Sequence, residues 1–226
     1  IARADELRRS LLSAVSHDLR TPLAAAKAAV SSLRGGDVDF SPEDTAELLA
    51  TIEESIDQLN ALVGNLLDSS RLAAGAVRPQ LRRVYLEEAV PRALIAIGAS
   101  APDRVKVDVA DTVVMADSGL LERVLANVID NALRYARDSP VRVTAGRVGE
   151  RVLIAVADEG PGIRRGTEAN LFAPFQRLGD QDTTNGGGLG LSVARGFVEA
   201  MGGTISSTDT PGGGLTIEID LAAPAR

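Results

Sequence analysis

The chain has 226 residues, enough for one large domain or two of ordinary size, and we take two as the working number. Its 24 basic and 31 acidic residues give a net charge of −7, and only 3% of residues are aromatic, so we expect no nucleic-acid surface. The absence of cysteine excludes disulfides and thiol nucleophiles and favours a cytoplasmic location. No apolar run approaches the roughly 20 residues that span a bilayer. Because the sequence opens on Ile1 rather than Met, we expect it to belong to a longer protein, in which any sensing or membrane part lies upstream.

Two long helices are predicted in the first third of the chain. Apolar residues recur every three or four positions over Leu11–Leu33, which is the pattern of a helix with one buried stripe. The segment Arg34–Asp37 interrupts this pattern, and Ser41 is the expected N-cap of a second helix. Heptad-like spacing continues to about Leu72, and Gly75 is the expected stop.

These helices form a hairpin over residues 1–75, which we take as the first domain. A two-helix hairpin cannot enclose a core around its own stripes, whereas two hairpins packed together make a four-helix bundle. The pattern therefore predicts a homodimer. Packing of the hairpin against the second half of the same chain is the alternative, which periodicity alone leaves open.

Residues 76–226 alternate between helix-like and strand-like segments and are predicted to form a second domain, an α/β sandwich, which makes the whole chain α+β. The predicted helices are Leu86–Ile97, Ser118–Tyr135 and Leu191–Met201, and the predicted strands are Val105–Val109, Val141–Ala145, Val152–Ala157 and Leu215–Leu221. The stretch from Gly160 to Gly190 shows little periodicity. Such a stretch is unusual inside a compact domain unless it is functional, so we interpret it as a binding loop or lid.

The first group of chemically capable residues lies within Ser16–Leu23 on the first helix. At about 100° per residue, His17 lies about 160° from Leu19 of the apolar stripe, so its imidazole is predicted to face solvent. A neutral imidazole nitrogen is a competent nucleophile near neutral pH, and Asp18 can fix its tautomer or accept the displaced proton. Thr21, one turn later, places a hydroxyl on the same face, where it can orient water. The alternative is an ordinary surface histidine.

The second group lies on the predicted helix Ser118–Tyr135. Asn127 and Asn131 are four residues apart on one face, a spacing that lets two amide oxygens approach one hard cation. Arg134 offers a charge for phosphate, and Tyr135 offers a ring that can pack on a base. Two asparagines making structural hydrogen bonds are the more ordinary interpretation.

The third group follows the predicted strand Val152–Ala157. Asp158, at the end of a buried strand, can accept a hydrogen bond from an exocyclic amine such as that of adenine, and Gly160 and Gly162 let the backbone turn sharply beside a ligand. An ordinary turn capped by the aspartate is the alternative.

The fourth group, Asn185–Leu191, opens the last predicted helix. Free amides at a helix N-terminus, reached closely because glycine has no side chain, suit a polyphosphate. The glycines at 186, 188 and 190 and Leu189 are the candidate binding residues. A flexible linker is the alternative. Just upstream, the rings of Phe172–Arg177 can anchor a lid while Arg177 reaches a terminal phosphate.

Together and in this order, these segments resemble the sensor histidine kinases of bacterial two-component systems. The corresponding boxes are His17–Leu23 (phosphoacceptor), Asn127–Tyr135 (N box), Asp158–Gly162 (first glycine box), Phe172–Arg177 (F box) and Gly186–Leu191 (second glycine box). The likeness covers nearly the whole chain. Within the family, Ser16–Leu23 is similar to Kdp-type potassium-responsive kinases. One departure is Arg134, where the family often has lysine, and the replacement keeps the charge.

The resemblance implies a helical dimerisation and histidine phosphotransfer domain followed by an ATP-binding sandwich of the Bergerat type, shared with gyrase, heat-shock protein 90 and mismatch-repair ATPases (GHKL). It implies ATP and Mg²⁺ as cofactors. The roles carried over are Asn131 as the leading magnesium ligand with Asn127 nearby, Asp158 for adenine, and Gly186, Gly188 and Gly190 around the triphosphate.

The function implied is autophosphorylation of His17 from Mg·ATP and transfer of the phosphoryl group to an aspartate of a cognate response regulator. With Asp18 and Thr21 beside the histidine, phosphatase activity toward that regulator is expected too. The full-length protein is expected in the inner (cell) membrane. Two alternatives are a GHKL ATPase, which typically carries glutamate where this chain has Asn127, and a signalling scaffold with a degenerate nucleotide site.

Overall fold

The computed structural model describes residues 2–35, 40–98, 102–136, 139–163, 166–167, 170–174 and 188–225, with side chains from residue 16 onward. The chain divides into two units, residues 1–68 with 179–189 and residues 69–178 with 190–226, and each is described by itself. This division assigns the last turn of the second helix to the second unit. The domain boundary after residue 75 stays a prediction. Within the described ranges, no helix is long and apolar enough to cross a membrane.

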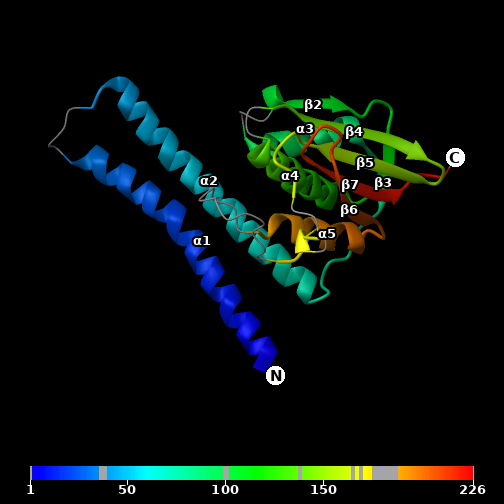
Figure 1. Ribbon diagram of the computed structural model, residues 1–226, viewed down its shortest axis with the longest axis horizontal. Helices are drawn as coiled ribbons and strands as arrows, with labels where there is room; N and C mark the ends of the chain where they lie inside the picture. Colours follow the sequence, from blue (N-terminus) through cyan, green and yellow to red (C-terminus); the bar gives the residue numbers. More distant parts are fainter. Residues whose placement is uncertain are drawn as a thin grey trace. The chain divides into compact units, whose positions relative to one another are not determined.

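Both predicted helices of the hairpin are present, as α1 (Ala2–Arg34) and α2 (Pro42–Ala73), and Figure 1 shows them running antiparallel. The helix α1 starts well before Leu11 because the preceding residues favour helix without adding to the apolar stripe. The predicted cap of α2 is confirmed: Ser41 Oγ accepts the Asp44 amide at 3.0 Å, and Asp44 Oδ2 accepts the Ser41 hydroxyl at 2.8 Å.

A line of apolar side chains stays uncovered on the hairpin. Leu49, Ile56 and Val63 recur every seven residues on α2, and each is about half exposed. Leu23 and Val30, also seven apart, are exposed on α1. On the same helix, Ser55, which directly precedes Ile56 and lies about 100° around the helix from it, is buried. A single hairpin therefore buries only part of its apolar stripe, which is the situation that a second hairpin resolves.

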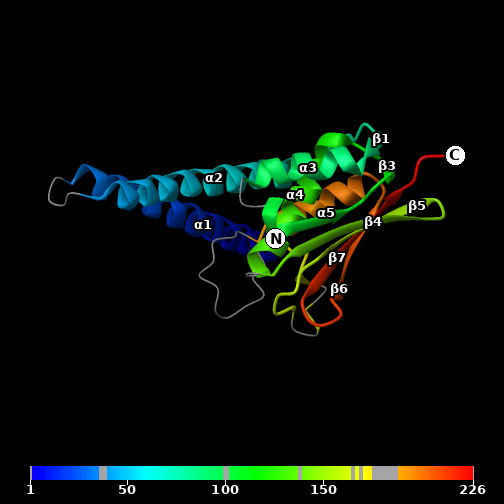
Figure 2. The same cartoon turned by 90° about the horizontal axis from the view of Figure 1, so that it is seen from above.

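The second unit is an α/β sandwich, as predicted. Its elements are β1 (Arg82–Tyr85), α3 (Leu86–Ile97), η1 (Pro102–Arg104), β2 (Val105–Asp108), β3 (Val113–Ala116), α4 (Ser118–Tyr135), β4 (Val141–Val148), β5 (Arg151–Ala157), α5 (Gly190–Ala200), β6 (Thr204–Asp209) and β7 (Leu215–Ala222). Five strands form a sheet in the order β2-β4-β5-β7-β6, with only the β2-β4 pair parallel, and β1 pairs with β3. The helices α3, α4 and α5 cover one face of this sheet (Figure 2).

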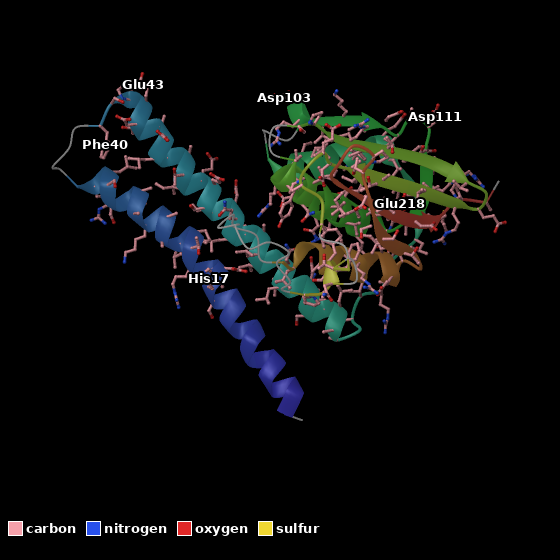
Figure 3. The ribbon with its side chains drawn as sticks, in the orientation of Figure 1. His17, Phe40, Glu43, Asp103, Asp111 and Glu218 are labelled. Atoms are coloured by element: carbon pink, nitrogen blue, oxygen red, sulfur yellow. The ribbon has the colours of Figure 1, made fainter. Side chains whose placement is uncertain are left out.

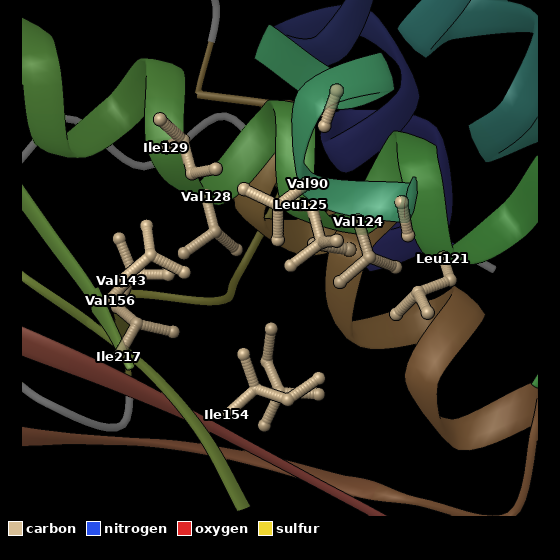
Figure 4. Packing of buried hydrophobic residues seen from close by; sticks show 14 of the residues in the cluster. Val90, Leu121, Val124, Leu125, Val128, Ile129, Val143, Ile154, Val156 and Ile217 are labelled. Carbon is tan, nitrogen blue, oxygen red and sulfur yellow. The ribbon is translucent and has the colours of Figure 1, made fainter. Parts of the chain in front are cut away.

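The core lies between α4 and the central strands (Figure 4). Buried residues alternate along β5 and β7, because successive strand residues point to opposite faces. On α4 the buried residues lie three and four apart, so they form one helical stripe. The facing residues include Leu121, Leu125, Val128, Val143, Ile154, Val156 and Ile217.

Three strands were not predicted: β1, β3 and β6. The edge strand β6, residues Thr204–Asp209, is composed mostly of serine, threonine and aspartate and is largely exposed, so it lacks an apolar alternation. The strands β1 and β3 are four residues each, too short for a two-residue period to stand out. Pairing with neighbouring strands, rather than local pattern, defines all three.

Within the second unit, the last turn of α2 packs on α5 at a glycine. A β-carbon at Gly196 would lie 2.6 Å from Cδ1 and 3.1 Å from Cδ2 of Leu72. Glycine inside a helix is unfavourable by about 1 kcal/mol relative to alanine. The contact with Leu72 explains why glycine stands at this position.

We predict that Gly196→Ala destabilises the second unit in the wild-type background, because the new methyl group displaces Leu72. In a Leu72→Ala background, the same change should stabilise the unit by about 1 kcal/mol, since only the helix propensity then remains. Urea unfolding followed by tyrosine fluorescence reports on this unit, as both tyrosines, Tyr85 and Tyr135, belong to it. Additive effects of the two substitutions would show that the contact does not matter.

Candidate nucleotide and phosphoacceptor sites

His17 lies on the solvent-exposed side of α1, as the periodicity predicts. Its side chain is 68% exposed, and Figure 3 shows it projecting from the helix. Its Nδ1 lies 3.5 Å from Oδ1 of Asp18, whose own side chain is largely buried. The aspartate is therefore placed to accept an Nδ1–H, which would leave the Nε2 lone pair facing solvent.

Thr21 lies one turn after His17. Its hydroxyl donates to the carbonyl oxygen of His17 at 3.3 Å, so the hydroxyl oxygen stays on the same stretch of helix as the imidazole. The helix α1 continues past Pro22, which is buried. Orientation of a water molecule by Thr21 stays a prediction.

Asp158 is a buried carboxylate, 2% exposed, directly after β5. Its Oδ1 accepts two backbone amides, from Gly160 at 2.8 Å and from Leu215 at 3.2 Å. Within the described part of the chain, no hydrogen bond ends at Oδ2. Burial raises the pKa of Asp158 above 3.8, while the amides of Gly160 and Leu215 act in the opposite direction. The hydrogen bond from the Gly160 amide is the one expected of an ordinary turn capped by an aspartate. Such a turn explains neither the burial of Asp158 nor the second hydrogen bond, from the Leu215 amide.

The loop after Asp158 packs on the end of α4. A β-carbon at Gly160 would overlap the carbonyl oxygen of Tyr135, so only glycine fits at this position. Gly162 has φ +68°, a left-handed conformation that favours glycine. The third predicted group thus lies beside the C-terminal end of the second.

Asn127 lies beside the start of α5. A β-carbon at Gly190 would be 3.3 Å from Oδ1 of Asn127, so the glycine lets the N-terminus of α5 approach α4 closely. Asn127 and Asn131 are both partly buried, and neither side-chain amide has a hydrogen bond to a described residue. Structural hydrogen bonds, the ordinary interpretation of this pair, are therefore not found within the described ranges.

The other end of the N box carries Arg134 and Tyr135. The Arg134 guanidinium donates to Asp130 Oδ2 from Nε and lies against the same oxygen with Nη2, both at 2.9 Å. This pair lies at the surface and its residues are separated by one helical turn, and ion pairs of this kind contribute little to stability. Tyr135 is 43% exposed, which leaves its ring accessible.

Three predicted groups therefore meet along α4. The start of α5 lies against Asn127, and the Asp158 loop lies against Tyr135. Eight residues of helix span about 12 Å at 1.5 Å per residue. The loop of the buried carboxylate lies at one end of this stretch, and the glycine start of α5 lies at the other.

Parts of the predicted site lie outside the described residues, namely Arg177 and Gly186. Gly188 is described, with φ +56°, and Leu189 is buried. Phe172 is buried in the core of the second unit. The roles predicted for these residues stay predictions.

Two residues beside Asp158 were not predicted to belong to the site: Gly214 and Leu215. In the sequence, the run Gly212–Gly214 indicates only a tight turn. A glycine run directly before a buried strand was the available signal, but nothing in the local sequence connects it with Asp158.

Two protein families match the chain. The His Kinase A (phosphoacceptor) domain family matches residues 7–75, and the family of histidine kinase-, DNA gyrase B- and HSP90-like ATPases matches residues 116–225. The first match contains His17, and the second contains α4, Asp158 and α5.

Curated relatives and solved structures agree with these matches. The sensor protein KdpD of Mycobacterium tuberculosis H37Rv is 80% identical over 231 residues, 99% of this chain and 27% of the relative. KdpD of Escherichia coli K12 is 33% identical, over 96% of this chain and 24% of the relative. The chain thus spans about a quarter of the length of these relatives.

Among solved structures, the histidine kinase AdeS of Acinetobacter baumannii has a TM-score of 0.66 at 26% identity, covering 92% of this chain and 98% of that one. Full-length ShkA in complex with AMPPNP has a TM-score of 0.64 at 26% identity, covering 96% of this chain and 47% of that one.

The raised pKa of Asp158 predicts a specific pH dependence of stability. Between 3.8 and the higher folded-state pKa, the folded chain holds a proton that the unfolded chain has lost. The contribution of Asp158 to the free energy of unfolding therefore falls as pH rises through this window. Urea unfolding of wild type and Asp158→Asn at a series of pH values should show the stability difference, wild type minus variant, decreasing with pH. A difference that grows with pH would contradict the assignment.

Proposed function

Because the chain belongs to the sensor histidine kinase family, and to its Kdp type, we propose that it binds ATP in the second unit and transfers the γ-phosphoryl group to His17. The observation that carries this proposal is the convergence on α4 of the buried Asp158 and the glycine start of α5, in a chain whose one histidine is exposed on α1.

The adenine base binds at the Asp158 end of α4. Oδ1 of Asp158 is occupied by two backbone amides, so Oδ2 accepts the hydrogen bond from the exocyclic amine of adenine. The Tyr135 ring packs against the base, for which its exposure leaves room. A buried acceptor discriminates strongly, because a base without the amine leaves it unpaired.

The phosphates bind at the Asn127 end of α4. The N-terminus of α5, which begins at Gly190, carries the positive end of the helix dipole and favours a negative charge. Arg134 leaves Asp130 and pairs with a phosphate oxygen. The resemblance to the family assigns four further residues to the binding of the triphosphate: Arg177, Gly186, Gly188 and Leu189.

Mg²⁺ fits the asparagine pair. Amide oxygens are hard donors, and those of Asn131 and Asn127 are not used by the described residues, so these two side chains would hold the ion. When bound, the ion neutralises charge on the phosphate oxygens.

Phosphoryl transfer is an in-line displacement. Asp18 accepts the Nδ1–H of His17, which fixes the tautomer with the lone pair on Nε2. Nε2 forms a bond to the γ-phosphorus while the bond from phosphorus to the bridging β–γ oxygen breaks, and ADP leaves with that electron pair. The Nδ1 proton passes to Asp18 or to solvent. Positioning and charge neutralisation supply most of the rate.

The phosphohistidine is then attacked by an aspartate of a response regulator that docks on the hairpin beside His17. In the reverse direction, Thr21 orients a water molecule that removes the phosphoryl group from the regulator, with Asp18 assisting. An upstream segment attaches the full-length protein to the inner (cell) membrane.

The first unit dimerises through the uncovered apolar line on α1 and α2. Leu49, Ile56 and Val63 are exposed in a single chain, and heptad spacing is what a helix partner requires. A second copy offers the same stripe, so two hairpins close one four-helix core.

His17→Gln should abolish labelling of the chain by [γ-³²P]ATP, because glutamine has no nucleophilic nitrogen. Thermal unfolding should not change, since His17 is exposed. Lys27→Gln, another exposed position on α1, serves as the matched control and should label like wild type. Label retained on His17→Gln would contradict the proposed function.

Ile56→Asp should raise the dimer dissociation constant by on the order of 100-fold, because two copies lose apolar burial and gain a charge in the same core. Sedimentation equilibrium measures this constant directly. Ala61→Asp, exposed on the same helix but turned away from the apolar line, is the control and should stay dimeric. Equal dissociation constants for the two variants would place the interface elsewhere.

A further inference from the structure

The loop that carries Asp158 is shaped by the glycine turn between β6 and β7. All three glycines of this turn have positive φ, +98° at Gly212, +114° at Gly213 and +110° at Gly214. Their surroundings differ, however. A β-carbon at Gly212 or Gly213 would meet nothing within 4 Å, whereas one at Gly214 would be closely surrounded.

Gly214 lies inside the curve of the Asp158 loop. A β-carbon there would overlap the carbonyl oxygen of Asp158 and lie 2.8 Å from Cα of Glu159. On the other side, a β-carbon at Gly162 would lie 3.1 Å from the carbonyl oxygen of Gly214. The loop from Asp158 to Gly162 therefore wraps around one backbone residue, and no side chain fits between them.

The close approach of Gly214 lets the next residue bind Asp158. The Leu215 amide donates to Asp158 Oδ1 at 3.2 Å, and the Leu215 carbonyl oxygen accepts the Asp158 amide at 2.9 Å. These two bonds fix both the main chain and the carboxylate of Asp158. If the turn moved away, Oδ1 would lose one of its two amides.

Thr210 closes the turn from the β6 side. Its amide donates to the Gly214 carbonyl oxygen at 3.2 Å, and its carbonyl oxygen accepts the Gly213 amide at 2.9 Å. Its hydroxyl lies 2.9 Å from that of Thr216, and its side chain is buried. The position of Gly214 is thus held by a closed hairpin.

We propose that Gly214 is a positioning residue for nucleotide recognition: its missing side chain lets the turn close on the Asp158 loop, so that Oδ1 is held by two backbone amides and Oδ2 is directed to the base. The proposal rests on the proposed function, since it assigns Gly214 a role in selecting adenine. A larger residue at 214 rotates the carboxylate and weakens selection for the exocyclic amine rather than phosphate binding.

The test is base selectivity, measured as the ratio of the dissociation constants of purine riboside triphosphate, which lacks the amine, and ATP. Isothermal titration with the 226-residue chain should give a ratio on the order of tenfold or more for wild type. Gly214→Ala should bring the ratio close to one. Gly213→Ala carries the same backbone strain without the contact, and it should keep the wild-type ratio.

A Gly214→Ala variant that keeps the wild-type ratio would overturn the proposal. If thermal unfolding shows that Gly214→Ala does not fold, Thr210→Val, which loses the hydroxyl contact to Thr216, takes its place and should lower the ratio by a smaller factor. A Thr210→Val variant with the wild-type ratio of dissociation constants would also contradict the proposal. A wild-type chain that binds both triphosphates equally would instead contradict the role of Asp158 in the proposed function.

Discussion

The second unit is organised around one buried carboxylate whose oxygens are used unequally. Asp158 is removed from water, yet two backbone amides satisfy Oδ1 only. Burial of an aspartate is costly, because water no longer solvates the charged form. The strand β5 leads directly into Asp158, the Leu215 amide at the start of β7 binds its carboxylate, and the end of α4 lies against the loop that follows it.

The two sites of the protein follow opposite physical rules. In the proposed function, base discrimination depends on the penalty for an unpaired buried acceptor, and Asp158 is buried. The proposed role of His17, to meet a nucleotide and then a partner, requires an exposed imidazole, and the side chain of His17 is 68% exposed beside Asp18. At Gly160 and Gly214 the neighbouring backbone leaves no room for a β-carbon, and at Gly190 a β-carbon would lie in a tight contact, 3.3 Å from Oδ1 of Asn127.

The helix bounds and the helix cap that depend on neighbouring residues could be predicted from the sequence. The bounds of α3 and α4 were predicted correctly because their apolar stripes begin and end with the helices. The cap at Ser41 was predicted from a serine followed by proline and acidic residues, and the Asp44 amide binds its hydroxyl oxygen. The edge strand β6 was missed since it is defined by pairing with β7 rather than by its own polar residues. Asp158, Asn127 and Gly190 were recognised as candidates, but the contact of Gly214 with Asp158 depends on the strand order and has no local sequence signal.

The central claim is that a nucleotide held on α4 phosphorylates an imidazole nitrogen on α1. The most direct measurement is mass spectrometry of the chain after incubation with Mg·ATP. The sample is kept alkaline throughout, and fragmentation of its peptides locates the modified residue. We expect one phosphoryl group per chain, on His17, which is lost on brief acidification and retained in alkali, as a phosphorus–nitrogen bond requires. A phosphoryl group on a serine, threonine or aspartate instead, or hydrolysis of ATP with no modified residue, would contradict it.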